Sequence, residues 1–324
     1  VENENFYCDN IDMKSTPEGL NKFFNVKIIA KNSAIKRSHK INISFIQIFS
    51  NLMSYIFNIF KTCQKDNNLY LIVSLTPYTF FACVILKFLG QKTFLYLRSN
   101  GYDEYRIKLG SIGYLIYHFM FSISSKITTL ISCREYILMG KKGHLVTPSQ
   151  ITYPWSQNLV EPELDTIKLI YIGRIRKEKG IFSLLNMIKN KSDINLTIVG
   201  AEKNFKKIGK NNTEILEIVE NEKELRKLYD KNNIMILPSY TEGYPMVVLE
   251  ALSRLRPVII FTEIEHIIEG RNGIFVSERN YDSLKSKINH IIKNYKSIQE
   301  SMKNNYVPTN EVFVNQIKEI ILKF

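Results

Sequence analysis

The chain has 324 residues and is 45% hydrophobic, which is enough material for two domains with separate cores. Its formal net charge is +13, and residues 1–160 carry +9 of that excess. A basic first half indicates a polyanionic neighbour (lipid headgroups, a phosphate-bearing substrate or nucleic acid) unless it only keeps a Lys-rich chain in solution. Since the charge is spread out and no nucleic-acid motif is found, nucleic acid is disfavoured.

The four cysteines are scattered and form no C-x-x-C pair: Cys8, Cys63, Cys83 and Cys133. This usage argues against a disulfide framework and a zinc site, and we expect a reducing cytoplasm. The chain opens on the polar, acidic VENENFYCDN, which does not resemble a secretory signal peptide.

The first half alternates strand-like and helical patterns. Strands are predicted at 26–30, 69–75, 93–99, 127–132 and 144–148, and helices near 16–24, 42–64, 77–89 and 106–124. Residues 41–60 carry no charge, but Ser44, Gln47, Asn51, Ser54 and Asn58 would form one polar stripe down a helix. We therefore expect an amphipathic helix on a sheet or a membrane surface rather than a membrane span.

The second half repeats this alternation more regularly. Strands are predicted at 168–173, 194–200, 215–219, 234–239, 258–261 and 273–276. Helices are predicted near 180–190, 202–209, 222–231, 245–255, 280–294, 296–305 and 311–323. Continuously apolar strands between helices are typical of parallel, doubly wound sheets covered on both faces. We predict an α/β protein with two Rossmann-like domains that face each other across a cleft.

The irregular segment 147–165 is expected to link the two halves. The predicted domains are residues 1–160 and 161–308, with a last helix, 309–324, that packs back toward the first domain. In such folds ligands bind at the carboxyl ends of the strands.

Two motifs follow strand ends in the second half. In GRIRKEKG (173–180), Arg174 and Lys179 lie between a strand and a helix start, where cations and free amides suit a diphosphate. An ordinary basic turn would look the same if this motif stood alone. Arg176 and Lys177, between them, are expected to be solvated.

The second motif, TEGYPMVVLEAL (241–252), is a turn followed by a helix. The free amides of Tyr244, Met246 and Val247 can bind phosphate oxygens. Glu250, one turn into the helix, suits a ribose diol, and Glu242 in the turn suits sugar hydroxyls. Either glutamate alone is equally consistent with a surface acid. The turn residues Gly173, Gly243 and Pro245 complete the predicted donor-binding set.

This half resembles the nucleotide-binding domain of retaining glycosyltransferases with the two-Rossmann (GT-B) fold, the group 1 family (family 4-like). The resemblance rests on GRIRKEKG (173–180), TIVG (197–200), KELRKLYDKNNIMILPSYTEGYPMVVLEAL (223–252), RPVI (256–259) and GRNGIFV (270–276). It implies that Arg174 and Lys179 hold the donor diphosphate, Glu242 the donor sugar and Glu250 the ribose. It also implies, more weakly, that Val219 and Glu220 lie beside the base.

The chain departs from the family pattern in two places. Leu255 and Arg256 precede Pro257, where the family has glycine before its Pro-Val pair. The first half lacks the usual opening strand and glycine-rich loop, so that either the N-terminus is incomplete or the first strand is trimmed. Among the histidines, only His266 follows a strand end and could approach the cleft.

The resulting hypothesis is a cytoplasmic hexosyl-type glycosyltransferase that acts with retention in polysaccharide, lipopolysaccharide or lipid-linked glycan synthesis. The donor is a nucleoside diphosphate sugar; no metal or other cofactor is expected, because Arg174, Lys179 and helix amides supply positive charge. The first domain would bind a lipid-linked or saccharide acceptor through Arg98, Asp103 and Glu104, and would contact the inner face of an anionic membrane. A non-catalytic sugar-nucleotide-binding protein and a GT-B epimerase remain alternatives.

Overall fold

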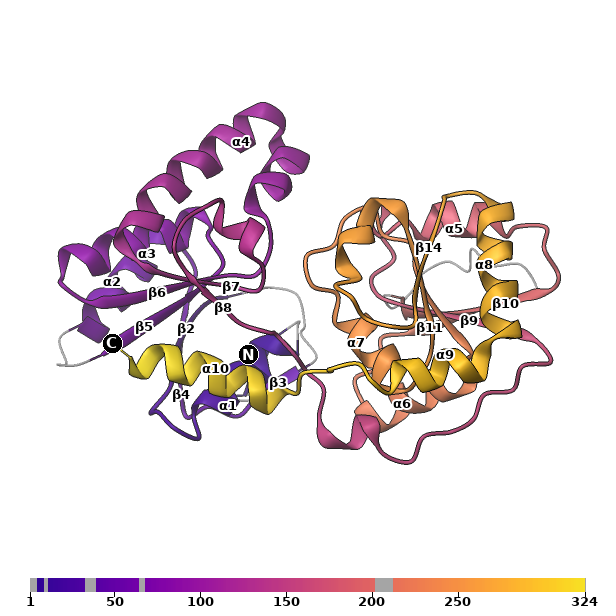
Figure 1. The fold of residues 1–324 in the computed structure, drawn as a ribbon. Helices are drawn as coiled ribbons and strands as arrows, with labels where there is room; N and C mark the ends of the chain where they lie inside the picture. The colour runs from indigo at the N-terminus through magenta and orange to yellow at the C-terminus, as the bar shows by residue number, and fades with distance from the viewer. Residues whose placement is uncertain (1–4, 9–10, 33–38, 64–67, 202–211, 324) are drawn as a thin grey trace. The chain divides into compact units, whose positions relative to one another are not determined.

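A computed structural model describes residues 5–8, 11–32, 39–63, 68–201 and 212–323. The chain divides into two compact units, residues 1–150 with 310–324, and residues 151–309 (Figure 1). The sequence predicts this boundary at 160, but the structure places it at 150. The reason is that Ile151 and Trp155 are buried in the core of the second unit.

The first unit is built on parallel strands. Its main sheet has the order β5-β6-β7-β8 (Leu69–Val73, Lys92–Leu97, Thr129–Ser132 and His144–Leu145). A second parallel pair joins β2 (Lys27–Lys31) to β4 (Phe45–Phe49), and β1 (Phe6–Cys8) pairs antiparallel with β3 (His39–Ile41). The helices are α1 (Asp12–Leu20), α2 (Leu52–Cys63), α3 (Pro77–Phe88) and α4 (Gly101–Ile127), with a 3₁₀ turn at Glu135–Leu138.

The helix predicted over 42–64 is wrong in its first third. Residues 45–49 form β4 in parallel register with β2, and α2 begins only at Leu52. Asn51, predicted to be part of a polar stripe, instead accepts a hydrogen bond from the backbone of Ser54 at the helix start. The alternation of Phe45, Gln47 and Phe49 with isoleucines has the period of a strand, which the helical spacing of the polar residues obscured.

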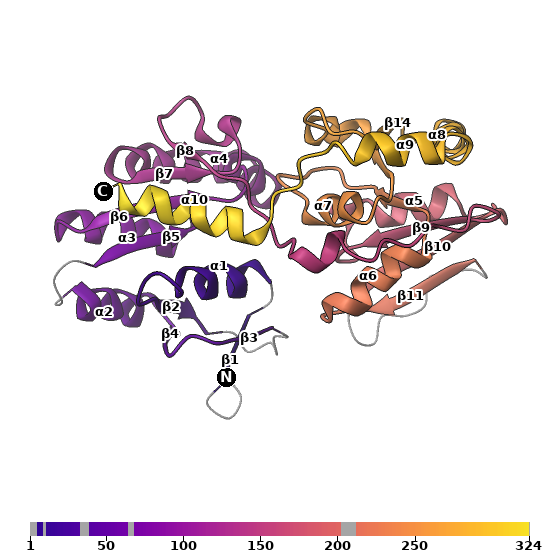
Figure 2. The ribbon, with the colours of Figure 1, turned by 60° about the horizontal axis from the view of Figure 1, so that its bottom comes forward.

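The last helix, α10 (Asn310–Leu322), belongs to the first unit and packs beside α1 in both ribbon views (Figures 1 and 2). Phe313, Val314 and Ile317 are buried against Phe94 and Ile131 of the main sheet. Gly19 of α1 also lies against the last helix, because a Cβ there would sit 2.6 Å from a methyl group of Val314. The C-terminal segment therefore completes the core of the first unit.

The second unit contains one six-stranded parallel sheet. The strand order is β11-β10-β9-β12-β13-β14 (Thr213–Glu217, Ile194–Ala201, Ile167–Ile172, Ile234–Leu237, Val258–Phe261 and Ile274–Ser277). Its helices are α5 (Ile181–Met187), α6 (Glu222–Lys231), α7 (Met246–Ser253), α8 (Tyr281–Lys293) and α9 (Tyr295–Met302). Short 3₁₀ turns lie at Tyr153–Ser156, Lys177–Lys179 and Thr262–Ile267. The helix expected near 202–209 falls outside the described residues.

Strands β12 and β13 of this sheet are continuously apolar because the middle of the sheet is buried on both faces. Every residue of β12 and β13 is buried, since helices cover both faces of the sheet. The strand order reverses between β9 and β12: the chain runs outward from β9 through β10 to β11, then returns to β12 on the other side. The carboxyl ends of β9 and β12 are therefore the topological switch point, where open α/β sheets bind ligands.

Helix α4 is the longest of the described helices, and Gly110 interrupts it with a positive φ of 64°. Within the described parts of the chain, no helix combines the length and apolarity that crossing a membrane requires.

Candidate donor-binding site

The site lies at the carboxyl ends of β9 and β12. The loop after β9 carries Lys179, and the loop after β12 carries Glu242. The Lys179 ammonium lies 2.6 Å from Oε1 of the Glu242 carboxylate, with the two side chains 23% and 10% exposed. Two side chains 63 positions apart, both predicted from the sequence, are thus brought into direct contact.

Further contacts fix this pair. The buried Ser239 hydroxyl donates to the same Glu242 oxygen at 2.6 Å, and the Nε2 atom of His266 lies 2.9 Å from the Glu242 carbonyl. Arg279 donates to the carbonyls of Pro238 and Ser239 and stacks on the Tyr240 ring. The turn that carries Glu242 is therefore held from several sides.

Gly180 allows the two loops to approach each other. It has a φ of +65°, and a Cβ at this position would lie 1.8 Å from the carbonyl oxygen of Pro238. The backbone of Tyr240 also donates to the carbonyl of Glu178 at 3.0 Å. No side chain larger than hydrogen fits without separation of the Lys179 and Glu242 loops.

We expect Gly180→Ala to abolish most ligand binding at this site and to lower the unfolding free energy by more than the roughly 1–2 kcal/mol of left-handed strain alone. Gly270→Ala is the matched control, because Gly270 also has a positive φ, of 72°, but a Cβ added there would have no atom within 4 Å. Urea unfolding and nucleotide titration of both variants make the comparison. Equal effects of the two substitutions would contradict the close approach.

Arg174 and Gly173 follow β9 directly. Gly173 donates its amide to the carbonyl of Val199, and Arg174 has an exposed side chain. The Tyr171 hydroxyl donates to the Arg174 carbonyl at 2.8 Å. Burial and the nearby charge of Glu242 raise the pKa of Tyr171, whereas Arg174 lowers it. Within the described parts of the chain, no hydrogen bond or ion pair joins the Arg174 side chain to the Lys179–Glu242 pair, so its role at a diphosphate stays a prediction.

The N-terminus of α7 opens beside Glu242. Pro245 occupies the cap position in an extended conformation, and no described side chain caps this helix end. The first amides of the helix, those of Met246 and Val247, are therefore available for an anion. Tyr244, in the turn, stacks under the Arg271 guanidinium, and Gly243 precedes it.

Glu250 lies one turn into α7. Its Oε2 atom accepts a hydrogen bond of 2.8 Å from the hydroxyl of Tyr229, a fully buried residue of α6. Burial raises the pKa of Glu250 to about 7, the Tyr229 hydrogen bond lowers it, and the charge of Glu222 raises it. Among ordinary carboxyl groups such a pKa is unusual, and perturbed ionisation of this kind is characteristic of functional sites.

Val219 and Glu220 lie in the turn between β11 and α6. Val219 packs against the core of the unit, and Glu220 is exposed. Nothing in the described part of the chain links either residue to the Lys179–Glu242 pair, so their role beside a base stays a prediction.

Three residues of the site were not predicted from the sequence: Ser239, Arg279 and Tyr229. Ser239 stands in the LPS segment directly after β12, so its place at a strand end was a usable signal. The sequence gives no such signal for Arg279 or Tyr229. Their contacts with residues 238–250 join segments about 20 to 40 positions apart in the chain.

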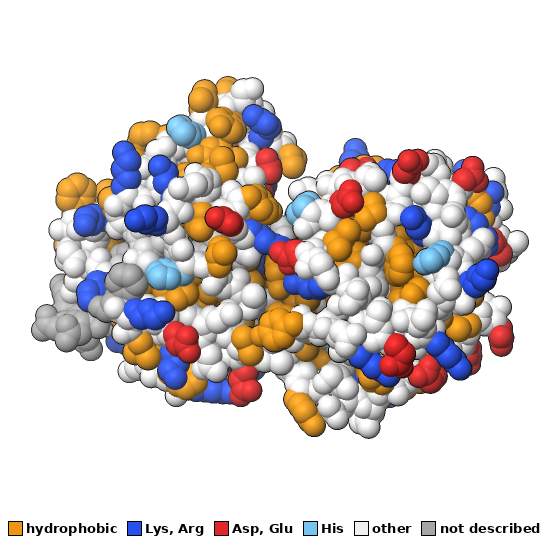
Figure 3. All heavy atoms as spheres, in the orientation of Figure 1, with side chains coloured by type: hydrophobic (Ala, Val, Ile, Leu, Met, Phe, Trp, Pro, Cys, Tyr) orange, Lys and Arg blue, Asp and Glu red, His pale blue; other side chains and the backbone are white. Residues whose placement is uncertain are grey.

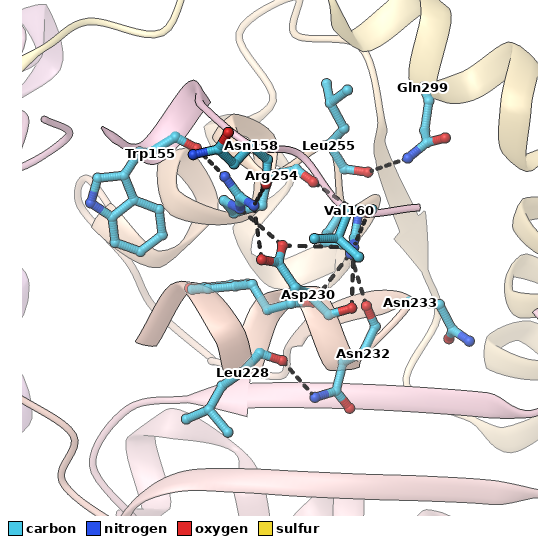
Figure 4. Close-up of polar contacts among 12 residues, drawn as sticks. Trp155, Asn158, Val160, Leu228, Asp230, Asn232, Asn233, Arg254, Leu255 and Gln299 are labelled. Carbon is cyan, nitrogen blue, oxygen red and sulfur yellow. Dashed lines mark hydrogen bonds and ion pairs between the residues drawn. The ribbon is translucent and has the colours of Figure 1, made fainter. Parts of the chain in front are cut away.

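A buried arginine pair supports the back of α7. The Arg254 guanidinium makes a two-pronged contact with the Asp230 carboxylate at 2.9 and 2.8 Å, and it donates to the carbonyls of Trp155, Gln157 and Asn158 (Figure 4). Arg256 donates to carbonyls in α6 and to that of Val160. Both side chains are at most 2% exposed. Their hydrogen bonds connect residues 155–160 to α6 and α7, the helices that carry Tyr229 and Glu250.

The first unit has its own pocket, of about 370 Å³, at the ends of β5 and β6. Arg98 and Glu104 line this pocket, whereas Asp103 is not among its lining residues and instead accepts a hydrogen bond from the Asn100 side chain. Asp103 and Glu104 lie in the first turn of α4 rather than in a loop, because Asn100 caps that helix. Arg98 pairs with Asp12 at 2.6 Å.

Residues 157–306 match the family described as "Glycosyl transferases group 1". A curated relative is an uncharacterized glycosyltransferase of Methanocaldococcus jannaschii, 31% identical over 135 residues, which are 39% of this chain and 38% of that protein. Another is the capsular polysaccharide biosynthesis glycosyltransferase CapM of Staphylococcus aureus, 24% identical over 44% of this chain and 40% of the relative. The matches thus span about two fifths of these relatives.

Among solved structures, Anabaena HepE in complex with UDP and glucose superposes with a TM-score of 0.65. The superposition covers 92% of this chain and 100% of HepE at 12% identity, so it shows the fold. The GT-B fold predicted from the sequence is confirmed. The match of residues 157–306 to the group 1 family confirms the resemblance drawn from the motifs.

Proposed function

We propose that the protein transfers a hexosyl group from a nucleoside diphosphate sugar to a hydroxyl acceptor, with retention of the anomeric configuration. The observation that carries this proposal is the contact of Lys179 with Glu242 at the switch point of the sheet, beside the open N-terminus of α7. The bond between the anomeric carbon and the diphosphate oxygen breaks, a bond forms between that carbon and the acceptor oxygen, which gives up its proton, and negative charge builds on the departing diphosphate. Arg174, Lys179 and the α7 amides stabilise that charge, so we propose that no metal is needed.

The other residues then have separate roles. In this proposal Glu242 accepts hydrogen bonds from the donor sugar, and Glu250, deeper along α7, accepts them from the ribose. The relatives support a place in the synthesis of a cell-surface polysaccharide, as the name of CapM indicates for that protein. HepE was solved with UDP and glucose, which supports a nucleotide-sugar donor here.

The test of donor use is a thermal-shift panel of nucleotide sugars followed by turnover with the ligand that stabilises most. We expect one base to raise the melting temperature and the sugar nucleotide to be consumed only with an acceptor hydroxyl present. Binding without turnover would favour the non-catalytic alternative, and conversion of the sugar without transfer would favour an epimerase. No stabilisation by any member of the panel would contradict the proposal.

We also propose a cytoplasmic protein whose first unit contacts the inner face of the membrane, where it meets a lipid-linked or saccharide acceptor. Exposed apolar side chains surround the Gly110 kink of α4, with Ile107, Leu109 and Ile112 each more than half exposed beside Arg106 and Lys108. In the space-filling view, hydrophobic and basic side chains lie together over α4 (Figure 3). Such a surface suits anionic lipid headgroups with apolar insertion.

We expect the protein to sediment with phosphatidylglycerol-containing vesicles and much less with phosphatidylcholine vesicles, since the basic surface requires an anionic headgroup. Ile107→Glu with Ile112→Glu should release it, while Ile218→Glu, at an exposed apolar position of the second unit, should not. Equal recovery in the supernatant with and without vesicles would contradict the membrane contact.

A further inference from the structure

Tyr229 is a buried titratable residue that contacts Glu250. The proposed mechanism gives Tyr229 no role. Its side chain is fully buried, and its hydroxyl has two oxygen neighbours, Glu250 Oε2 at 2.8 Å and the carbonyl of Val247 at 3.2 Å. Both neighbours belong to the first two turns of α7. A tyrosine buried only for packing needs one hydrogen-bond partner, whereas this one lies between a carboxyl and a backbone carbonyl.

We propose that Tyr229 is a positioning residue of the donor site, which fixes one oxygen of the Glu250 carboxyl and leaves the other to accept hydrogen bonds from a ribose diol. The inference rests on the proposed function, since it takes Glu250 as the ribose ligand. It goes further by assigning the orientation of that ligand to a residue on another helix, α6.

The Tyr229 hydroxyl can form a hydrogen bond with Glu250 whether the carboxyl is ionised or protonated. When the carboxyl is ionised, the tyrosine donates its proton to Oε2. When the carboxyl is protonated, Tyr229 accepts from it and donates to the Val247 carbonyl instead. The tyrosine hydroxyl and the carboxyl oxygen that it contacts are then paired in either state, which a phenylalanine could not achieve.

Tyr229 is itself held rigidly. The Trp155 ring meets its ring edge to face at 5.8 Å, and Arg256 donates to its backbone carbonyl at 3.1 Å. A side chain locked by packing and backbone contacts can orient a ligand without further loss of freedom on binding. The groups that act on the charge of Glu250 are Tyr229 and Glu222, both of α6, and Glu222 is also engaged by Thr152 and Arg226.

The pH dependence follows from the sign of the shift. Ionised Glu250 offers the ribose diol a charged oxygen, which is a stronger acceptor than the neutral carbonyl oxygen that is left when Oε2 is protonated toward Tyr229, so binding strengthens as pH rises through the Glu250 pKa of about 7. Below that pH, affinity should fall by up to about tenfold per unit, toward the weaker binding of the neutral carboxyl. The Tyr229 hydrogen bond lowers the pKa of Glu250. Removing this bond should therefore move the midpoint of the affinity-against-pH curve to higher pH.

The experiment titrates the full chain with UDP, GDP and ADP, and with the 2′-deoxy form of whichever binds, between about pH 6 and 9, which brackets the ionisation of Glu250. The variants are Tyr229→Phe and the matched control Tyr295→Phe, a buried tyrosine whose hydroxyl donates to the carbonyl of Asn233, away from Glu250. We expect Tyr229→Phe to weaken binding of the ribonucleotide about tenfold or more at neutral pH, with a raised midpoint. The 2′-deoxynucleotide keeps only one of the two ribose hydroxyls, so the substitution should cost it clearly less affinity than it costs the ribonucleotide.

Equal losses for the ribo- and deoxynucleotide, or an unmoved pH midpoint, would overturn the positioning role while nucleotide binding itself stands. Absence of nucleotide binding by the wild type would overturn the proposed function and this inference with it. Urea unfolding of both tyrosine variants shows whether either substitution lowers stability. A merely structural loss would also lower the affinity for both nucleotides to the same extent.

Discussion

Replacing Lys179 with alanine is expected to lower kcat/KM for the nucleotide sugar by about 10²–10³-fold, the usual effect of removing one charge-stabilising group from a transition state. Lys179 forms an ion pair with Glu242, and its ammonium lies in a largely enclosed position where solvent screens it little. The release of nucleoside diphosphate by wild type and variant measures the effect.

Lys177→Ala is the matched control, because Lys177 lies in the same loop two residues earlier and is exposed. We expect its activity to stay near that of the wild type. If both alanine variants kept wild-type activity, the loop would be an ordinary basic turn and the diphosphate would have to be held elsewhere.

The second large effect concerns stability. Arg254→Ala should lower the unfolding free energy of the second unit by about 3–5 kcal/mol, because it takes from the Asp230 carboxylate, 15% exposed, its closest cationic partner. It also removes the donors to the carbonyls of Trp155, Gln157 and Asn158 (Figure 4).

The chain provides its own probe for this measurement. Trp155 is the single tryptophan, and it lies in the second unit against the arginine pair, so its fluorescence in urea reports that unit rather than the whole chain. Lys303→Ala, which breaks an exposed pair with Glu300, should change stability by no more than about 1 kcal/mol. A similar small change for Arg254→Ala would contradict a structural role for the buried pair.

The strands of the second unit could be predicted to within a few residues because each is a continuous apolar run between turn signals. The Lys179 and Glu242 loops could also be placed near each other, since the carboxyl ends of parallel strands share one edge of a sheet. Their direct contact could not be foreseen, because it depends on the close approach of Gly180 to the carbonyl of Pro238.

The segment SRLRP shows where sequence reasoning stops. Its pattern indicates only the loss of a glycine that touches no ligand, and Leu255 does take the left-handed conformation, with a φ of 52°. The two arginines on either side are buried, although arginine is usually exposed. The partners of Arg254 are Asp230, 24 positions away, and the carbonyls of Trp155, Gln157 and Asn158, nearly 100 positions away, and only the fold brings them together.

The first unit was harder to predict because its strands are short and partly exposed. Phe45–Phe49 pairs with β2 rather than extending α2, and the C-terminal helix supplies part of the core from the far end of the chain. The acceptor side therefore stays a prediction for Arg98, Asp103 and Glu104, of which two line a common pocket.

A crystal structure of the protein with the nucleoside diphosphate that stabilises it most tests the central claim most directly. We predict that the diphosphate oxygens lie within hydrogen-bond distance of the Lys179 ammonium and the first amides of α7, with the ribose hydroxyls on the Glu250 carboxyl. A nucleotide bound away from the ends of β9 and β12, with the Lys179–Glu242 pair untouched, would contradict the account.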